Sequence, residues 1–273
     1  MLDSVTTTQI TVYVDEDQTL DAERSHTTED YQYVAFSGSG VMELRDQTFL
    51  ENPVTVTLQN TYTDPVIITT PYFTNDLRSP ASIRVYDVST NTFTAKLDTP
   101  TDNFPVVNTT FSDDIYYLVV EAGTWQIGDM KIEAQVDTVS TVNSYANGWT
   151  GTTTTFEHAF TGAPIVLHQV MSNNDSSWIT SWASRTADRT NPPNTSGFQL
   201  GLNAAEVTTS NAHAAEDVGW IAFNNLGSGT VNGVDFRTFA QTELPLGHQT
   251  GCYTFTPGDT YSAPVPLIAQ NSM

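Results

Sequence analysis

The chain has 273 residues, 38% of them apolar, which is enough for two domains of roughly 100 residues with cores of their own. Nine basic against 31 acidic residues give a formal charge of −22, which argues against nucleic-acid binding because phosphate contacts need clustered Lys and Arg. A single cysteine excludes an intrachain disulfide and a thiolate metal cluster, and no apolar run is long enough for membrane insertion.

The first predicted element is a short strand at residues 10–14, along which apolar residues alternate with Thr11 and Tyr13. The runs at 92–97 and 197–202 have the corresponding position later in the chain, because each precedes one of the recurring strands at 113–120 and 216–223. The N-terminal segment is therefore typical of the back half of a domain.

The next predicted strand, 29–36, opens with two carboxylates and recurs at 113–120 and 216–223. Large aromatic residues fall at matching alternate positions of the three copies: Tyr33, Tyr117 and Trp220. Each copy is predicted to be a strand that is buried on at least one face. Repeated strands indicate repeated domains.

A second recurring pattern opens each copy, at 56–68, 155–167 and 255–267. Two predicted strands flank a short turn, and a proline starts the second strand, where a missing N–H is tolerated. Two further segments, 123–133 and 227–240, predict hairpins that cross from one domain to the next. Because Thr, Val, Ile, Tyr and Phe dominate these segments, we predict an all-β fold of antiparallel strands with helix nearly absent.

These patterns divide the chain into four parts: 1–47 is the C-terminal part of a repeat, 48–128 and 129–233 are complete repeats, and 234–273 is the N-terminal part of a further repeat. The two end parts lack a strand that matches 83–86. Neither end can bury its apolar face alone. We therefore expect that the C-terminal strands of one molecule complete the N-terminal strands of a neighbour in a homo-oligomer, or that the chain is cut from a longer array.

The order of these elements resembles the H-type lectin domain: a hairpin with an aromatic residue, a turn and a proline, then a Thr-rich strand, a Gly-Phe strand and a closing strand that is acidic and then aromatic. The best match runs from Thr152 to Phe223, and a looser match runs from Val54 to Glu121. The resemblance implies small antiparallel, jelly-roll-like β-sandwiches in tandem. It also implies contact with hydroxyl-rich sugars such as N-acetylgalactosamine.

The resemblance also implies a sugar site. The family binds sugars with an Asp in the loop after the proline strand, an Arg further on, and a Trp-His pair before the closing strand. These positions correspond here to Asn173, Asn174 and Asp175 in the loop, Arg185 or Arg189 as the arginine, and His213 as the histidine. The expected glycan-binding residues are therefore Asn174, Asp175, Arg185 and His213, and the Trp has no counterpart.

No catalytic residue, metal or cofactor is predicted. His26 and His213 each lie three residues before a Glu, which indicates a histidine–carboxylate hydrogen bond that orients a loop. His158 and His168 fall on different strands of one hairpin, with no acid at a spacing that would complete a metal set. No Gly-Xaa-Ser-Xaa-Gly motif is present, and acidic pairs that recur once per copy are typical of a fold rather than of catalysis.

The sequence therefore predicts a non-enzymatic extracellular or virion structural or adhesion protein, such as a tail fibre, spike, capsid decoration protein or surface fibre, built from lectin-like repeats that bind cell-surface glycans. The alternative is a purely structural filament or surface-layer subunit that assembles head to tail by strand complementation without binding sugar. Expected partners are glycans, further copies of the chain and other virion or surface proteins, but neither nucleic acid nor membrane. The N-terminus lacks a signal-peptide pattern, which favours a virion component.

Overall fold

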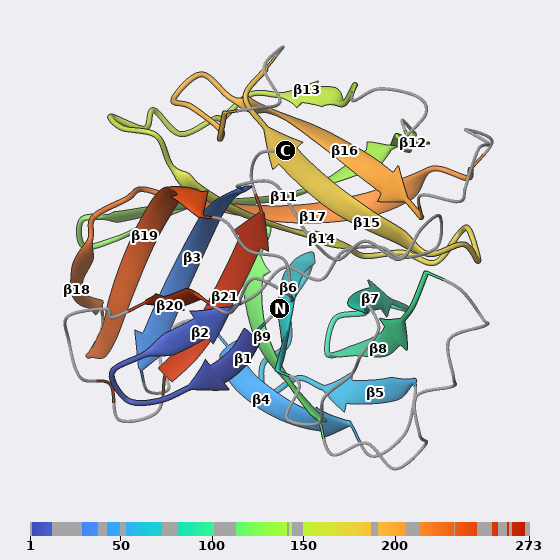
Figure 1. The fold of residues 1–273 in the computed structure, drawn as a ribbon, viewed down its shortest axis with the longest axis horizontal. Coiled ribbons are helices and arrows are strands. Elements are labelled where there is room, and N and C mark those ends of the chain that lie inside the picture. Colours follow the sequence, from blue (N-terminus) through green and yellow to red (C-terminus); the bar gives the residue numbers. More distant parts are fainter. Residues whose placement is uncertain are drawn as a thin grey trace.

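The structure is a computed structural model that describes residues 2–12, 29–37, 43–49, 53–72, 81–100, 113–140, 142–143, 150–186, 191–205, 213–231, 233–244, 253–255, 261 and 264–270 (Figure 1). Within these ranges the chain forms strands and no helix, which confirms the all-β prediction. The strands form several small sheets that are antiparallel except for two short parallel pairings, β1 with β6 and β12 with β16. None of the described residues belongs to a helix that could cross a membrane.

The strands fall into three units, each made of two sets of paired strands, and the β1–β6 pairing joins one set of the third unit to one set of the first as a six-stranded sheet. The first unit contains β4 (Glu43–Phe49), β5 (Val54–Thr57), β6 (Pro65–Tyr72), β7 (Ser82–Tyr86), β8 (Thr92–Asp98) and β9 (Asp113–Glu121). The second contains β10 (Gly123–Ile127), β11 (Met130–Val139), β12 (Val142–Asn143), β13 (Thr152–Thr154), β14 (Ile165–Val170), β15 (Ile179–Ser184), β16 (Phe198–Ala204) and β17 (Glu216–Phe223). The third combines both ends of the chain: β1 (Leu2–Val5), β2 (Ile10–Val12), β3 (Glu29–Ser37), β18 (Ser228–Val231), β19 (Val234–Leu244), β20 (Tyr253–Phe255) and β21 (Pro264–Gln270).

The same pairing order recurs in the three units. One sheet has the order β4-β9-β6, β11-β17-β14 or β19-β3-β21, and the other has the order β5-β8-β7, β13-β16-β15 or β20-β2-β1. The central strands β9, β17 and β3 are the three recurring strands of the sequence, here called signature strands. Their neighbours β6, β14 and β21 follow or start at a proline and are here called proline strands.

Each signature strand buries both of its faces. Trp220 and Tyr33 point into separate cores of their own units, whereas Tyr117 belongs to a larger cluster that all three units share, and all three are at most 2% exposed. Tyr117 packs edge to face on Phe93 of the opposite sheet, and Trp220 does the same on Phe198. Because successive side chains of a strand point to opposite faces, the next residue of each signature strand points the other way.

That other face builds a core common to all three units. In each unit the residue after the aromatic one pairs across the sheet with an apolar residue of the proline strand: Leu118 with Ile68, Ile221 with Leu167, and Val34 with Leu267. All six are at most 1% exposed and belong to one cluster. In the second and third units the two faces of the signature strand therefore pack into a separate core on one side and the shared core on the other, whereas in the first unit both faces belong to the shared core.

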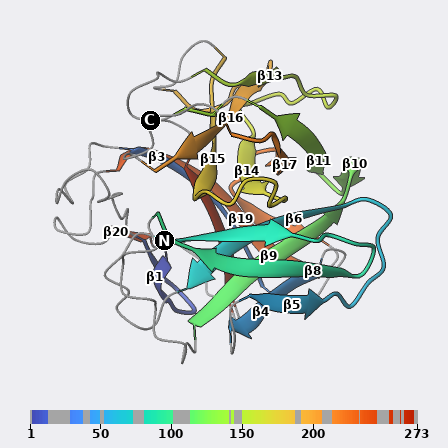
Figure 2. The same ribbon diagram turned by 90° about the vertical axis from the view of Figure 1, so that its right-hand side faces the viewer.

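The three units close into a ring. The signature strand β17 contacts β6 of the first unit, β9 contacts β21 of the third, and β3 contacts β14 of the second. The proline strands β6, β14 and β21 also contact one another (Figures 1 and 2). Hydrogen bonds join them, since Thr69 donates to Gln169 Oε1 at 2.5 Å and the Ile268 N–H donates to Thr70 Oγ1 at 3.0 Å.

The two ends of the chain complete each other. The C-terminal β21 pairs with β3 over seven residues, Gln270 opposite Tyr31 through Pro264 opposite Ser37, and β20 pairs with β2. The strand expected to be missing is present as β1, which pairs with β2 as β7 pairs with β8. The expectation of a missing strand was therefore wrong. The complementation expected from a neighbouring molecule takes place here within one chain.

The two predicted crossing hairpins are confirmed. The hairpin of β10 and β11 follows the first unit, yet β11 pairs with β17 of the second. The hairpin of β18 and β19 likewise leaves the second unit, and β19 pairs with β3 of the third. In the same way β4, which follows β3, pairs with β9 of the first unit. Each unit, or in the third unit its C-terminal part, thus begins with strands that follow the signature strand of another unit along the chain.

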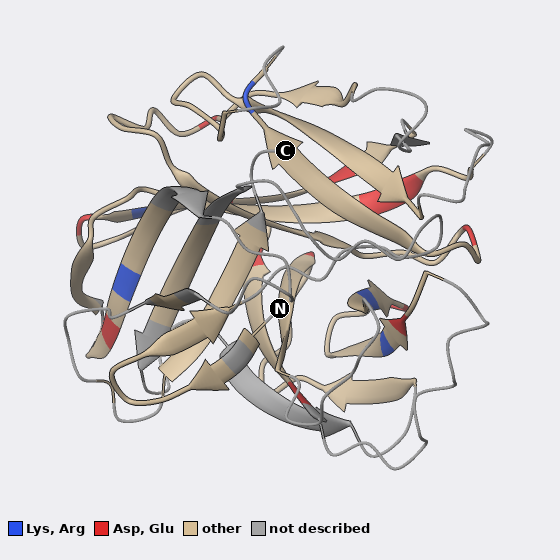
Figure 3. Ribbon diagram, in the orientation of Figure 1, with Lys and Arg blue, Asp and Glu red and all other residues tan. Residues whose placement is uncertain are grey.

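Basic residues are few and scattered over the described strands (Figure 3). Two of them, Arg84 on β7 and Lys96 on β8, lie beside the acidic Asp98, whose carboxylate they share. Lys96 is 30% exposed at its side chain, whereas Arg84 is only 1% exposed. A buried arginine in so acidic a chain needs particular partners, and these define the candidate site.

Candidate functional site

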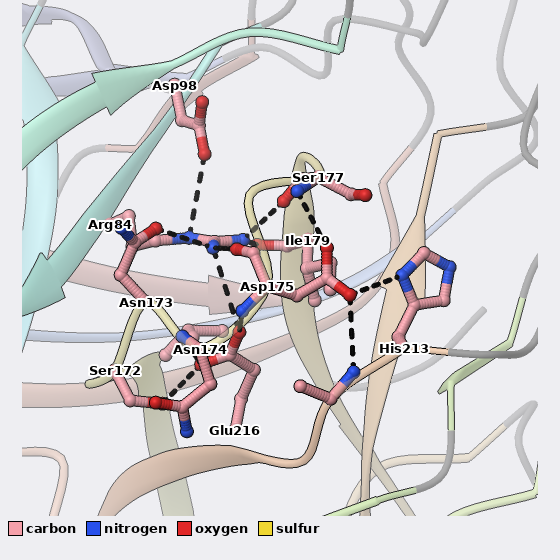
Figure 4. A network of polar contacts seen from close by, with 12 residues as sticks. Arg84, Asp98, Ser172, Asn173, Asn174, Asp175, Ser177, Ile179, His213 and Glu216 are labelled. Carbon is pink, nitrogen blue, oxygen red and sulfur yellow. Dashed lines mark hydrogen bonds and ion pairs between the residues drawn. The ribbon is translucent and has the colours of Figure 1, made fainter.

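The candidate site is the loop 171–178, which joins β14 to β15 and so leads from one sheet of the second unit to the other (Figure 4). It contains Asn174 and Asp175, two of the residues expected from the sequence. Groups from the first unit, from the start of β17 and from the segment before β17 surround it.

Glu216, the first residue of β17, holds the loop from one side. Its side chain is fully buried, and its carboxylate accepts hydrogen bonds from the Ser172 hydroxyl, from the Asn174 N–H at 3.1 Å and from the Asp175 N–H at 2.8 Å. The Asp217 N–H donates in turn to Ser172 Oγ at 2.7 Å. These hydrogen bonds tie the segment 172–175 of the loop to the first two residues of β17.

Arg84 holds the loop from the other side, although it belongs to the first unit. Nη1 donates to Asn173 Oδ1 at 3.0 Å and to the Asp175 carbonyl at 2.6 Å. Nη2 donates to the Ser177 carbonyl at 2.8 Å and to the Ile179 carbonyl at 3.4 Å. The planar guanidinium matches several acceptors of one loop at once, which an ammonium group could not do.

Two carboxylates balance the charge of Arg84. Glu216 Oε1 lies 3.8 Å from Nη1, and Asp98 Oδ2 lies 3.5 Å from Nε (Figure 4). Both distances are longer than a hydrogen bond, so the attraction is mainly Coulombic. The Arg84 guanidinium therefore lies between Asp98 of its own unit and Glu216 of the second unit, and it bonds to the loop 171–178 at the same time.

Asp175 fixes the outer turn of the loop. Its Oδ1 accepts the Ser177 N–H at 2.8 Å, and its Oδ2 accepts the Ala214 N–H at 3.2 Å and His213 Nδ1–H at 3.1 Å. Burial raises the pKa of the Asp175 carboxyl, but the hydrogen bonds from Ser177, Ala214 and His213 outweigh it and lower the pKa to about 2. Asp175 is thus an ionised hydrogen-bond acceptor at neutral pH.

Further contacts anchor the start of the loop to the first unit. The Ile67 N–H points at Met171 Sδ, 3.4 Å away, and Gln169 Nε2 donates to the Ile83 carbonyl at 2.7 Å. Gly219 makes room for Met171, because a Cβ there would lie 2.2 Å from Met171 Sδ. The glycine of the second signature strand is thus explained by contact between units.

The structure brings together three of the four residues expected in the sugar site. Asn174, Asp175 and His213 share the loop network, with Asn174 Nδ2 donating to the Ala215 carbonyl at 2.8 Å. Arg185 lies past the far end of β15, roughly 20 Å along the strand from Ile179 at about 3.3 Å per residue. The alternative, Arg189, lies outside the described residues.

The residues that do most to hold the loop are Arg84 and Glu216, and neither was expected at a site. Arg84 stands between Ile83 and Val85, where strand alternation favours a solvated face, although it is one of only nine basic residues in the chain. The acidic pair that opens β17 was attributed to the fold, which agrees with the position of Glu216. The direct contact of Glu216 with the loop 171–178 could not be predicted from the recurrence of the acidic pair.

The histidines have ordinary partners. The carboxylate bound by His213 belongs to Asp175, not to the Glu three residues later, and His26 lies outside the described residues. His158 Nε2 bonds to the Trp125 carbonyl at 3.0 Å, and His168 Nδ1 bonds to Ser181 Oγ at 2.9 Å. Across the described part of the chain, no three His, Cys, Asp or Glu residues gather as metal ligands do.

Comparison with protein-family models, with curated proteins and with solved structures found no match to this chain. The resemblance to H-type lectins therefore stays a prediction based on residues 54–121 and 152–223.

Proposed function

We propose that the protein is a non-enzymatic structural or adhesion protein of a virion or of the extracellular surface, such as a tail fibre, spike, capsid decoration protein or surface fibre, and that its loop 171–178 contacts glycans. In this proposal the three units are lectin-like, jelly-roll-like β-sandwiches. One observation carries it: buried Arg84 and Glu216 fix the loop backbone, while the side chains of Asn173, Asn174 and Ser176 are exposed.

A loop held in this way suits recognition better than catalysis. Acid–base catalysis needs a group whose pKa lies near the working pH, whereas the pKa of Asp175 is about 2. Both oxygens of Asp175 and both oxygens of Glu216 accept hydrogen bonds from the protein itself. A backbone that is fixed before binding loses little entropy when a ligand arrives, which favours affinity.

The exposed groups suit neutral sugars. Amide and hydroxyl side chains such as those of Asn174 and Ser176 donate and accept hydrogen bonds with sugar hydroxyls. The formal charge of −22 repels sialylated or sulfated glycans. The expected ligand is therefore a neutral cell-surface glycan.

A glycan array probed with the full chain and with Asn174→Ala tests this proposal. Truncating one hydrogen-bonding side chain in a real site should weaken binding by on the order of 1–3 kcal/mol. If the wild type binds no glycan at millimolar concentration, glycan contact is ruled out and the structural alternative remains.

The structural alternative also has an observation in its favour, since β21 and β3 already complete each other. The same seven residue pairs could form between two copies, which would give head-to-tail oligomers. Light scattering on the full chain and on a chain without residues 242–273 tests strand exchange. Identical monomer masses would contradict it.

A further inference from the structure

Trp125 is the most exposed of the large apolar residues that the structure describes. It lies on β10, the edge strand of the sheet β10-β11-β17-β14, and is 42% exposed. Trp182 and Trp220 are 4% and 1% exposed, and in the described ranges only Leu226, at 39%, is comparable among large apolar residues. Exposed large apolar side chains are therefore few among the described residues.

The indole of Trp125 is held in one orientation. Its Nε1–H donates to the Glu121 carbonyl at 2.8 Å, and its ring lies against Gly123, where a Cβ would be 3.8 Å from three ring atoms. Gly123 has φ +126°, which a residue with a side chain rarely adopts. Because the N–H is already bonded, the group left for a ligand is the face of the ring.

The position also argues against an added β-strand. The Trp125 carbonyl is bonded by His158 Nε2 at 3.0 Å, so this edge of β10 is already occupied at its centre. A strand from another chain could not pair there without displacing His158. A small, flat ligand needs no such displacement.

Thr63 and Asp64 of the first unit are bonded to Glu121, the residue whose carbonyl holds the indole. The Thr63 and Asp64 N–H groups donate to the Glu121 carboxylate at 2.8 and 2.7 Å, and the Ala122 N–H donates to the Asp64 carbonyl at 2.9 Å. This turn is therefore bonded to Glu121, whose carbonyl also accepts the indole N–H, and to the adjacent Ala122. The side chains of Thr63 and Asp64 are exposed, and no described residue bonds to them.

We propose that Trp125, Thr63 and Asp64 form a second carbohydrate site, at the junction of the first and second units, for a neutral pyranose ring. The slightly positive C–H face of the sugar stacks on the negative face of the indole. The Asp64 carboxylate and the Thr63 hydroxyl bond the sugar hydroxyls. The Asp64 charge and the net charge of −22 select against acidic sugars. This inference rests on the proposed glycan-binding function but places a site outside the loop 171–178.

The test is an array of neutral, sialylated and sulfated glycans probed with the full chain, Trp125→Ala, Trp125→Phe, Asp64→Asn and Asn174→Ala. Melting temperatures confirm that each variant is folded. We expect Trp125→Ala to lower binding of neutral glycans about tenfold, the loss of one stacked aromatic face, whereas Trp125→Phe retains most of it. Asp64→Asn should weaken the signals that Trp125→Ala weakens, whereas Asn174→Ala should weaken only the signals of glycans bound by the loop 171–178.

Binding of Trp125→Ala equal to that of the wild type would overturn the inference while leaving the proposed function intact. If Asn174→Ala alone lowers glycan binding, the second site is likewise ruled out and the proposed function stands. A wild type that binds no glycan would overturn both, and preference for sialylated or sulfated glycans would contradict the charge argument.

Discussion

Arg84 Nη1 donates to the carbonyl oxygen of Asp175 at 2.6 Å, although the two residues belong to different units and lie 91 positions apart. The contact crosses the boundary between the first two units at a point where both are buried or half-buried. The conformation of the candidate loop therefore depends on a side chain that its own unit does not supply.

Replacing Arg84 should be costly. Arg84→Met leaves Glu216 and Asp98 without their buried cation and leaves the loop carbonyls without donors, so we expect a loss on the order of 3 kcal/mol in the free energy of unfolding. Lys96→Met is the matched control, because Lys96 pairs with the same Asp98 at 3.2 Å but is 30% exposed. Its cost should stay below about 1 kcal/mol. Urea unfolding of both variants measures the difference, and equal losses would contradict the role of Arg84.

Stability should also depend on the protonation of Asp175. Its pKa is lowered from 3.8 to about 2 in the folded chain, so its contribution is fully present above about pH 4 and is lost as the pH falls towards 2. Asp175→Asn lacks this contribution. Urea unfolding between pH 2 and pH 5 should show a shallower decline for Asp175→Asn than for the wild type. Parallel curves would mean that Asp175 does not titrate with a lowered pKa.

The acidic pair at the start of β17 offers a comparison of neighbours. Glu216→Gln removes the charge from a fully buried group that faces Arg84 and accepts two loop N–H donors, and we expect a loss of about 2–4 kcal/mol. Asp217→Asn changes a half-buried carboxylate whose hydrogen bond to Thr138 is at the surface, and it should cost under about 1 kcal/mol. Hydrogen exchange should show faster exchange of the loop amides in Glu216→Gln alone.

The C-terminal strand should be essential to the ring. Leu267 of β21 is fully buried in the shared core opposite Val34, so Leu267→Ala should cost about 2–5 kcal/mol. Leu226→Ala, at a site that is 39% exposed, is the control and should cost far less. Thermal unfolding checks both. A small effect at Leu267 would show that the third unit is not locked to the other two.

The strands could be predicted from the sequence because alternation and aromatic spacing are local properties. Tyr33, Tyr117 and Trp220 lie where the repeat predicts, and the crossing hairpins follow from the position of 123–133 between two signature strands. The closure of the ring could not be predicted, because a strand such as 264–270 does not specify whether it pairs within its own chain or with a neighbour. Leu2–Val5 is too short to stand out as a strand before its partner β2 is known.

The candidate site was predictable only in part, for a similar reason. Asn174, Asp175 and His213 fall where the resemblance places them, in the loop after the proline strand and before the closing strand. Arg84 could not be found in this way, since its partners lie about 90 residues further along the chain and belong to another unit. The resemblance pointed to Arg185 instead, which the structure places past the far end of β15.

Glycan affinity of Asn174→Ala compared with that of Arg185→Ala tests the central claim most directly. Both variants remove a polar side chain of the second unit, but only Asn174 lies in the loop held by Arg84 and Glu216. Titration of the best array ligand whose binding Trp125→Ala leaves unchanged should show that Asn174→Ala weakens binding by roughly tenfold, as expected for the loss of one hydrogen-bonding group, while Arg185→Ala binds as the wild type does. Weaker binding by Arg185→Ala with no change in Asn174→Ala would contradict the account.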